Sequence, residues 1–179
     1  DLRPDKPLAV YAARCREAFK AIPIILGGLE ASLRRLVHYD YIEDRLKRSI
    51  LTNAKADLLV YGMAERQILE IATRLSVGEC VSGLTDIAGV AWRAIGGLCP
   101  PQEAIRLPSF EDLQKNIELF MTAQLEYQKQ AWPGGRPAIQ SQGGESVVIN
   151  PPAQPLTEEQ MDALYDLPFT RIWHPKYDS

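Results

Sequence analysis

Apolar residues recur at helical spacing in four segments of the chain. In residues 7–20 they fall on one face of a helix; the members are Leu8, Tyr11, Ala12, Cys15, Ala18 and Phe19. A second helix follows Gly62 and is marked by Ile68, Ile71, Ala72 and Leu75. Ser109 with Asp112 starts a predicted helix over 109–130, and Thr157 with Gln160 starts one that carries Met161, Leu164 and Tyr165.

Two short, continuous apolar runs predict strands that are buried on both faces. Residues 22–26 are followed by Gly27-Gly28 and a helical pattern over 30–36, and residues 57–61 are followed by Gly62 and the next helix. Strands joined by helical crossovers run parallel. The repeated unit therefore predicts an α/β fold, a Rossmann-like or flavodoxin-like three-layer sandwich with a mostly parallel sheet.

The remaining segments complete one domain. Further strands are predicted at 87–92, 104–107 and 147–149, a short helix at 44–51, and a loop at 133–146 because of its glycines and prolines. We assign residues 1–167 to the domain and 168–179 to a linker. Asp1 is not an initiator methionine and no apolar signal core follows it, so the chain reads as a fragment that lacks its natural start.

Composition narrows the class of protein. Of 179 residues, 46% are hydrophobic and 24% charged, which is typical of a globular domain. The net charge of −3 provides no overall field for nucleic acid or anionic lipid. The longest apolar runs are far shorter than the roughly 20 residues of a membrane span. Three widely spaced cysteines, Cys15, Cys80 and Cys99, indicate reduced thiols and a cytoplasmic location.

The two glycine turns are the first candidate site, because open α/β sheets bind ligands at strand ends. The candidate ligand-facing residues are Gly27, Gly28, Glu30, Ser32, Gly62, Met63 and Glu65. In the alternative interpretation, which we favour, the glycines allow tight turns and the acidic residues stabilise helix starts. Neither G-x-G-x-x-G nor a P-loop pattern is present.

A basic patch is the second candidate. It comprises Arg34, Arg35, Arg45, Lys47 and Arg48, with His38, Tyr39 and Tyr41 interleaved. Such a pattern is compatible with bases stacking on aromatic rings while arginines contact phosphates. The favoured alternative is a solvated helix face with i,i+4 pairs, Glu43/Lys47 and Asp44/Arg48. No metal site and no catalytic residue are assigned, because ligand-type spacing and a G-x-S-x-G motif are absent.

Several blocks together resemble one family. They are Arg3-Pro4-Asp5-Lys6, residues 23–35, His38-Tyr39-Asp40-Tyr41, residues 48–51, residues 56–63, residues 107–110, residues 150–157, Met161-Asp162 and His174-Pro175. This series is similar to the YgiQ family of radical SAM proteins. The resemblance implies a Rossmann-like, cobalamin-binding-like region that precedes a radical SAM barrel. In the family, a C-x-x-x-C-x-x-C loop of the barrel holds a 4Fe-4S cluster that cleaves S-adenosylmethionine.

The resemblance also implies a role for the chain. Residues 171–179 resemble the segment just before the barrel, and none of the three cysteines is placed to supply the cluster loop. The expected function is therefore an accessory, non-catalytic domain that positions substrate or covers the barrel. Its partner is that barrel, and the 4Fe-4S cluster and S-adenosylmethionine belong to the full-length protein. The alternative is a stand-alone module that binds a small ligand or nucleic acid.

Overall fold

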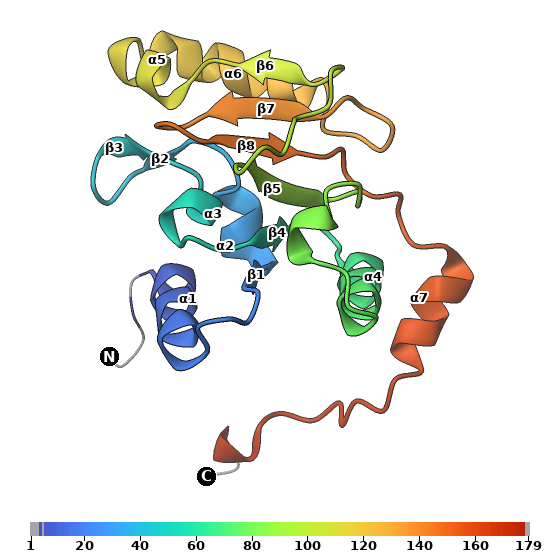
Figure 1. The fold of residues 1–179 in the computed structure, drawn as a ribbon. Helices are drawn as coiled ribbons and strands as arrows, with labels where there is room; N and C mark the ends of the chain where they lie inside the picture. Colours follow the sequence, from blue (N-terminus) through green and yellow to red (C-terminus); the bar gives the residue numbers. More distant parts are fainter. Residues whose placement is uncertain (1–3, 5, 178–179) are drawn as a thin grey trace.

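The computed structural model describes residues 4 and 6–177, so Arg3, Asp5 and the expected truncated start lie outside the described residues. Its centre is a six-stranded sheet in the order β1-β4-β5-β8-β7-β6 with helices on both faces (Figure 1). The strands are β1 (Ile25–Leu26), β4 (Leu58–Val60), β5 (Val90–Ala94), β6 (Ile105–Leu107), β7 (Ala138–Ser141) and β8 (Ser146–Ile149).

The α/β class and the Rossmann-like sandwich are confirmed, with a sheet that is mixed. The parallel pairing predicted for the two strand–glycine–helix units joins β1 to β4, and β6 also pairs parallel with β7. The β4–β5, β5–β8 and β7–β8 pairings are antiparallel, which the expectation of a mostly parallel sheet missed. After helix α4 (Glu65–Ser76), residues 77–89 return the chain to the end of β4, where the Tyr61 N–H donates to Gly89 O at 2.9 Å.

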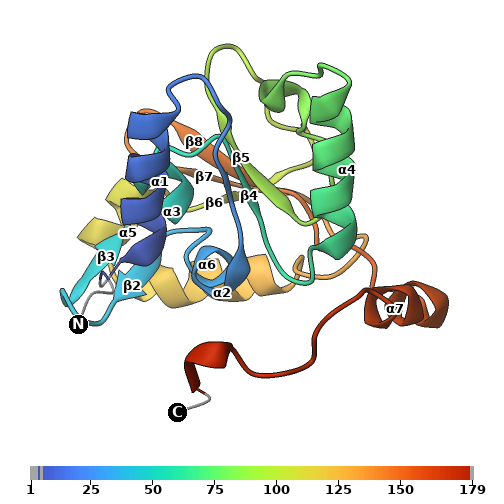
Figure 2. The same ribbon diagram turned by 90° about the horizontal axis from the view of Figure 1, so that it is seen from below.

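Two apolar cores lie on opposite faces of the sheet. In β4, Leu59 packs into one core and its neighbours Leu58 and Val60 into the other, as strand geometry requires. Helices α1 (Pro7–Ala18), α2 (Gly28–Leu33), α3 (Ile50–Asn53) and α6 (Glu118–Gln128) contribute to the first core, and α4 (Glu65–Ser76) to the second. Figure 2 shows α4 on the side opposite α1 and α3.

Two predicted helices are corrected. Residues 44–51 form strand β3 (Arg45–Lys47), which pairs with β2 (His38–Asp40) as an antiparallel hairpin before the short α3. The helix predicted over 109–130 is divided into α5 (Phe110–Lys115) and α6. Asn116 leaves helical geometry, and its Oδ1 accepts the N–H of Glu118 at 3.0 Å. An asparagine that satisfies a backbone donor in this way begins a new helix.

The segment 133–146, predicted as a loop, contains strand β7. Gly143 and Gly144 adopt positive φ values of 72° and 90°, and the Gln142 N–H donates to Glu145 O at 2.8 Å. These glycines therefore build a tight hairpin turn between β7 and β8 rather than a long connection. Turn residues that close a hairpin look the same in sequence as residues that line a loop.

The chain beyond the sheet forms an exposed C-terminal arm, residues 154–177. It holds the predicted helix α7 (Glu158–Tyr165), started by the Thr157/Gln160 capping box, and the short η2 (Pro175–Tyr177). None of its residues is buried. Figures 1 and 2 show the arm extending away from the body. No helix in the described part of the chain is long and apolar enough to cross a membrane.

Candidate functional site

The two predicted glycine turns lie together at the carboxyl ends of β1 and β4. Gly28 and Gly62 have φ values of 85° and 74°, a conformation that favours glycine. The Gly62 N–H donates to Ser32 Oγ at 3.2 Å, and Ser32 Oγ donates to Gly28 O at 2.9 Å. Ser32 thus connects the two turns. Gly27 lies beside them, and a Cβ added there would be 3.9 Å from Val60 O, an ordinary contact.

The other predicted ligand-facing residues are divided. Glu30 points toward Arg34 and α1: its carboxylate accepts from Arg34 at 2.8 Å and from the Leu8 N–H at 3.4 Å. Glu65 is exposed at the start of α4, and no hydrogen bond or ion pair found in the described residues joins it to Glu30. Glu30 thus takes part in the packing of α1 against α2, whereas Glu65 stands at a helix start, where a carboxylate is favourable. Met63 is 70% exposed beside Gly62.

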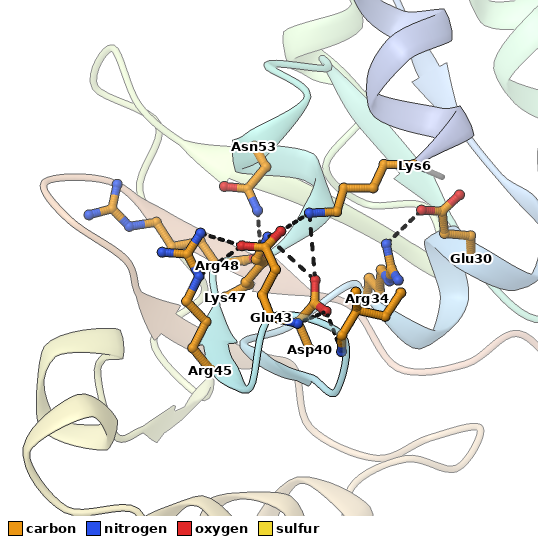
Figure 3. Close-up of polar contacts among 10 residues, drawn as sticks. Lys6, Glu30, Arg34, Asp40, Glu43, Arg45, Lys47, Arg48 and Asn53 are labelled. Carbon is orange, nitrogen blue, oxygen red and sulfur yellow. Dashed lines mark hydrogen bonds and ion pairs between the residues drawn. The ribbon is translucent and has the colours of Figure 1, made fainter. Parts of the chain in front are cut away.

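The basic patch is separated into two environments. Most of the patch surrounds a cavity of about 290 Å³; these residues are Arg34, Arg45, Lys47 and Arg48, together with Lys6, His38, Asp40 and Asn53. We call this group, with Glu43, the hairpin network (Figure 3). Arg35 instead lies between two tyrosines, with its Cζ 4.7 Å from the ring centroid of Tyr61 and 5.3 Å from that of Tyr127.

Carboxylates compensate the cations of the hairpin network. Glu43 accepts hydrogen bonds from Lys6, Arg45 and Lys47. Asp40, which is 3% exposed, lies 3.4 Å from Lys47 Nζ and 3.8 Å from Lys6 Nζ. Because three cations donate to it, Lys47 first among them, the pKa of Glu43 is held well below its usual value.

Asp40 also organises the hairpin turn. Its Oδ1 accepts the N–H groups of Ile42 at 3.1 Å and Glu43 at 3.2 Å. Burial opposes ionisation of Asp40, but these backbone donors and Lys47 outweigh burial and lower its pKa. Burial of the neighbouring His38 lowers the pKa of its imidazole. The network is thus an ionised, internally paired cluster.

The i,i+4 pairs predicted on a helix meet different fates in the hairpin. Glu43 and Lys47 do pair, across the turn. Asp44 has a φ of 49° and accepts a hydrogen bond from the Tyr39 hydroxyl. Arg48 contacts no carboxylate among the described residues; its Cζ lies 5.1 Å from the Phe110 ring centroid, and its guanidinium packs against Gly143. A β-hairpin, like a helix, can bring together side chains that are four positions apart in the sequence.

Sequence reasoning missed three participants: Lys6, Asp40 and Asn53. Lys6 connects the start of α1 to the hairpin, and the Asn53 side chain donates to the Arg48 carbonyl at 2.9 Å. Only Asp40 had a local signal, because an aspartate often starts a turn by accepting the backbone N–H two residues further along the chain. The positions of Lys6 and Asn53 depend on tertiary packing.

The residues present do not fit an iron–sulfur cluster. Cys15 lies on α1, Cys80 just before η1 (Val81–Gly83) and Cys99 in the segment after β5, and all three are exposed and free. Among residues 4 and 6–177, no group of three histidine, cysteine or acidic side chains is arranged to hold a metal ion. A cluster needs three thiolates from neighbouring positions, so no step of chemistry is assigned to one here.

Comparisons with known proteins place this α/β domain. The family model described as Radical SAM N-terminal matches residues 1–179. A UPF0313 protein of Bradyrhizobium diazoefficiens is 45% identical over an alignment that covers 98% of this chain and 29% of that protein. The UPF0313 proteins of Geobacter sulfurreducens and Shewanella oneidensis are 43% and 34% identical, with 98% of this chain and 29% and 30% of theirs covered. No solved structure matches the chain significantly.

The fold is a Rossmann-like α/β sandwich with a mixed sheet. The chain belongs to the Radical SAM N-terminal family, and the predicted relationship to the N-terminal region of radical SAM proteins is confirmed. It spans about 29% of the length of the curated relatives it matches.

Proposed function

We propose that this chain is an accessory domain that supports a radical SAM barrel by covering it or by positioning its substrate, and that it carries out no catalytic step itself. The family match and the coverage of 29% support this proposal, because the relatives contain a much larger second part. In the full-length protein, that second part is expected to hold the 4Fe-4S cluster and S-adenosylmethionine. A cytoplasmic location stays a prediction.

The observation that carries the proposal is an apolar surface on one side of the molecule. The open edge, which we define as Leu29, Leu33 and Met63 near the glycine turns, is 69–77% exposed. The C-terminal arm adds Phe169 and Ile172, which are 62% and 70% exposed. The three residues of the open edge lie around the two turns that Ser32 joins. Exposed apolar residues gathered in one place mark an interaction surface.

A binding experiment tests the docking role. This chain is mixed with the separately expressed remainder of the Bradyrhizobium relative, and the dissociation constant is measured by titration calorimetry. We expect a stable complex. Ile172→Glu and Leu33→Glu should each weaken it by about tenfold, because a charge replaces buried apolar contact. Val77→Glu is the matched control, since Val77 is 79% exposed but lies at the end of α4, away from the open edge. Failure of the wild-type chain to associate contradicts the docking role.

A second experiment tests the absence of a catalytic step. The chain is reconstituted anaerobically with iron and sulfide and then given S-adenosylmethionine and a reductant. We expect neither cluster absorbance nor formation of 5′-deoxyadenosine, because its cysteines lie on three separate segments. A 4Fe-4S spectrum with cleavage of S-adenosylmethionine by this chain alone would falsify the proposal.

A further inference from the structure

Arg35 is a half-buried cation to which the described residues offer no carboxylate. Its guanidinium lies between the rings of Tyr61 and Tyr127. Its Nε donates to the Tyr127 hydroxyl at 3.2 Å, and its Nη1 donates to the Ser32 carbonyl. These partners are neutral, so they fix the orientation of the guanidinium without compensating its charge.

The charge of Arg35 is uncompensated, whereas the charge of its neighbour Arg34 is compensated. Arg34 is paired with Glu30 at 2.8 Å within the same helix turn. Taking a cation partly out of water without an opposite charge is unfavourable. A position held this rigidly, with no hydrogen bond from Nη2 found in the described part of the chain, is therefore suited to an anion that arrives from outside.

The surroundings of Arg35 have the composition of an interface anchor. It lines a cavity of about 240 Å³ between the end of α2 and α6, with Leu33, Leu36, Val37, His38, Phe120, Gln124 and Tyr127. Arginine and tyrosine at the centre of an apolar rim are typical of energetically dominant contacts in protein interfaces. Leu33 belongs both to this rim and to the open edge.

We infer that Arg35 receives the carboxylate of an aspartate or glutamate on the polypeptide that docks against the open edge. The inference rests on the proposed function and names the chemistry at the centre of that interface. A guanidinium pairs with a carboxylate through two parallel hydrogen bonds. The apolar walls suit an acidic side chain flanked by apolar residues. A nucleic acid needs several cations along its backbone, and Arg35 is the one arginine or lysine that lines this cavity in the described chain.

The test measures the dissociation constant of this chain and the remainder of the Bradyrhizobium relative at several salt concentrations. Arg35→Met should weaken binding about tenfold, as expected for loss of a charge-assisted pair, and should make binding less sensitive to salt. The dissociation constant of Arg35→Lys should lie between those of the wild type and Arg35→Met, because lysine keeps the charge but loses the planar guanidinium. Arg14→Met is the matched control: Arg14 is exposed on α1 and paired with Glu17 at 2.7 Å.

The outcomes separate this inference from the proposed function. If the wild-type chain does not associate at all, the proposed function itself is wrong. If the wild-type chain associates and Arg35→Met binds equally well with the same salt dependence, only the role of Arg35 is overturned. Equal weakening by Arg14→Met also overturns it, because a general charge effect would then explain the loss. Circular dichroism checks that each variant is folded. If Arg35→Met does not fold, Arg35→Lys still provides the test.

Discussion

The hairpin network and the surroundings of Arg35 hold cations from one short stretch of sequence in opposite ways. In the network, Glu43 and Asp40 accept from or face Lys6, Arg45 and Lys47, so these three cations are compensated within the chain, whereas Arg48 packs against Phe110. In the cavity between α2 and α6, tyrosine rings orient Arg35, and no carboxylate in the described chain pairs with it. The difference leads us to expect that the first region stabilises the fold and that the second receives the proposed partner.

The largest expected effect concerns how the hairpin is attached to the sheet. Gln140 is 2% exposed; its Oε1 accepts the Val37 N–H at 3.0 Å, and its Nε2 donates to Pro108 O at 3.0 Å. Gln140→Leu leaves both backbone groups buried without partners, so the free energy of unfolding should fall by about 2–3 kcal/mol. Urea denaturation measures it. Ser141→Ala on the same strand is the control, because Ser141 is exposed.

A small loss for Gln140→Leu would contradict the view that buried amides hold the hairpin. In that case the ion pairs of the network would have to provide the attachment.

The next effect is a pH dependence that distinguishes the two regions. The pKa values of Glu43 and Asp40 lie below their ordinary values of 4.5 and 3.8. A carboxyl whose pKa is lower in the folded state stabilises above its unfolded pKa and loses that contribution as pH falls. The urea concentration at the unfolding midpoint should therefore decrease as the pH is lowered below about 4.5. Glu43→Gln should flatten this decline, whereas Arg35→Met should leave its shape unchanged.

Other groups also titrate in the acid range, so the test compares the pH profiles of the urea midpoint between the wild type and the variants. Interactions likewise lower the pKa values of Glu79 and Asp112. They are present in every variant and cancel in the comparison. Identical pH profiles for wild type and Glu43→Gln would show that the hairpin network contributes nothing to stability.

The smallest effect is expected from the C-terminal arm. Deletion of residues 158–179 removes α7, which has no buried residue. The free energy of unfolding of the isolated chain should change by less than about 0.5 kcal/mol, as is typical for surface changes. The same deletion should weaken association with the barrel-containing remainder. A large loss of stability would mean that the arm is part of the domain and not of its docking surface.

Local signals predicted the elements whose cause is local. The capping boxes at Ser109 and Thr157 are both present, and the helices α1 and α4 lie where the apolar spacing predicted them. Their predicted apolar faces are only partly buried: Ala12 is the buried member of the first and Ile71 of the second, whereas Tyr11, Phe19 and Ile68 are exposed. The strand predicted before Gly62 is buried throughout as β4, as a continuous apolar run predicts. The strand predicted over residues 22–26 is limited to Ile25–Leu26, and Ile22 is 55% exposed. The meeting of the two glycine turns followed from parallel pairing, which the structure confirms for β1 and β4.

Distant contacts explain the predictions that were wrong. The spacing of Glu43 and Lys47 fits a helix, but pairing of β2 with β3 and packing of Leu46 against Leu113 and Phe110 favoured a hairpin. Strand β7 was hidden because glycines and prolines surround it, and it is stabilised by two neighbouring strands. The position of Arg35 between Tyr61 and Tyr127 joins residues 92 positions apart and left no trace in local sequence.

The amino-acid sequence by itself determined the α/β class, most element positions, the glycine turns and the family relationship, because each of these depends on short-range patterns or on motifs in order. Only the tertiary structure decided the strand order, the antiparallel centre of the sheet, and which basic residues meet a carboxylate. The physical reason is that charge compensation and strand pairing depend on groups brought together across the whole chain, and their energies are settled by packing rather than by neighbours in sequence.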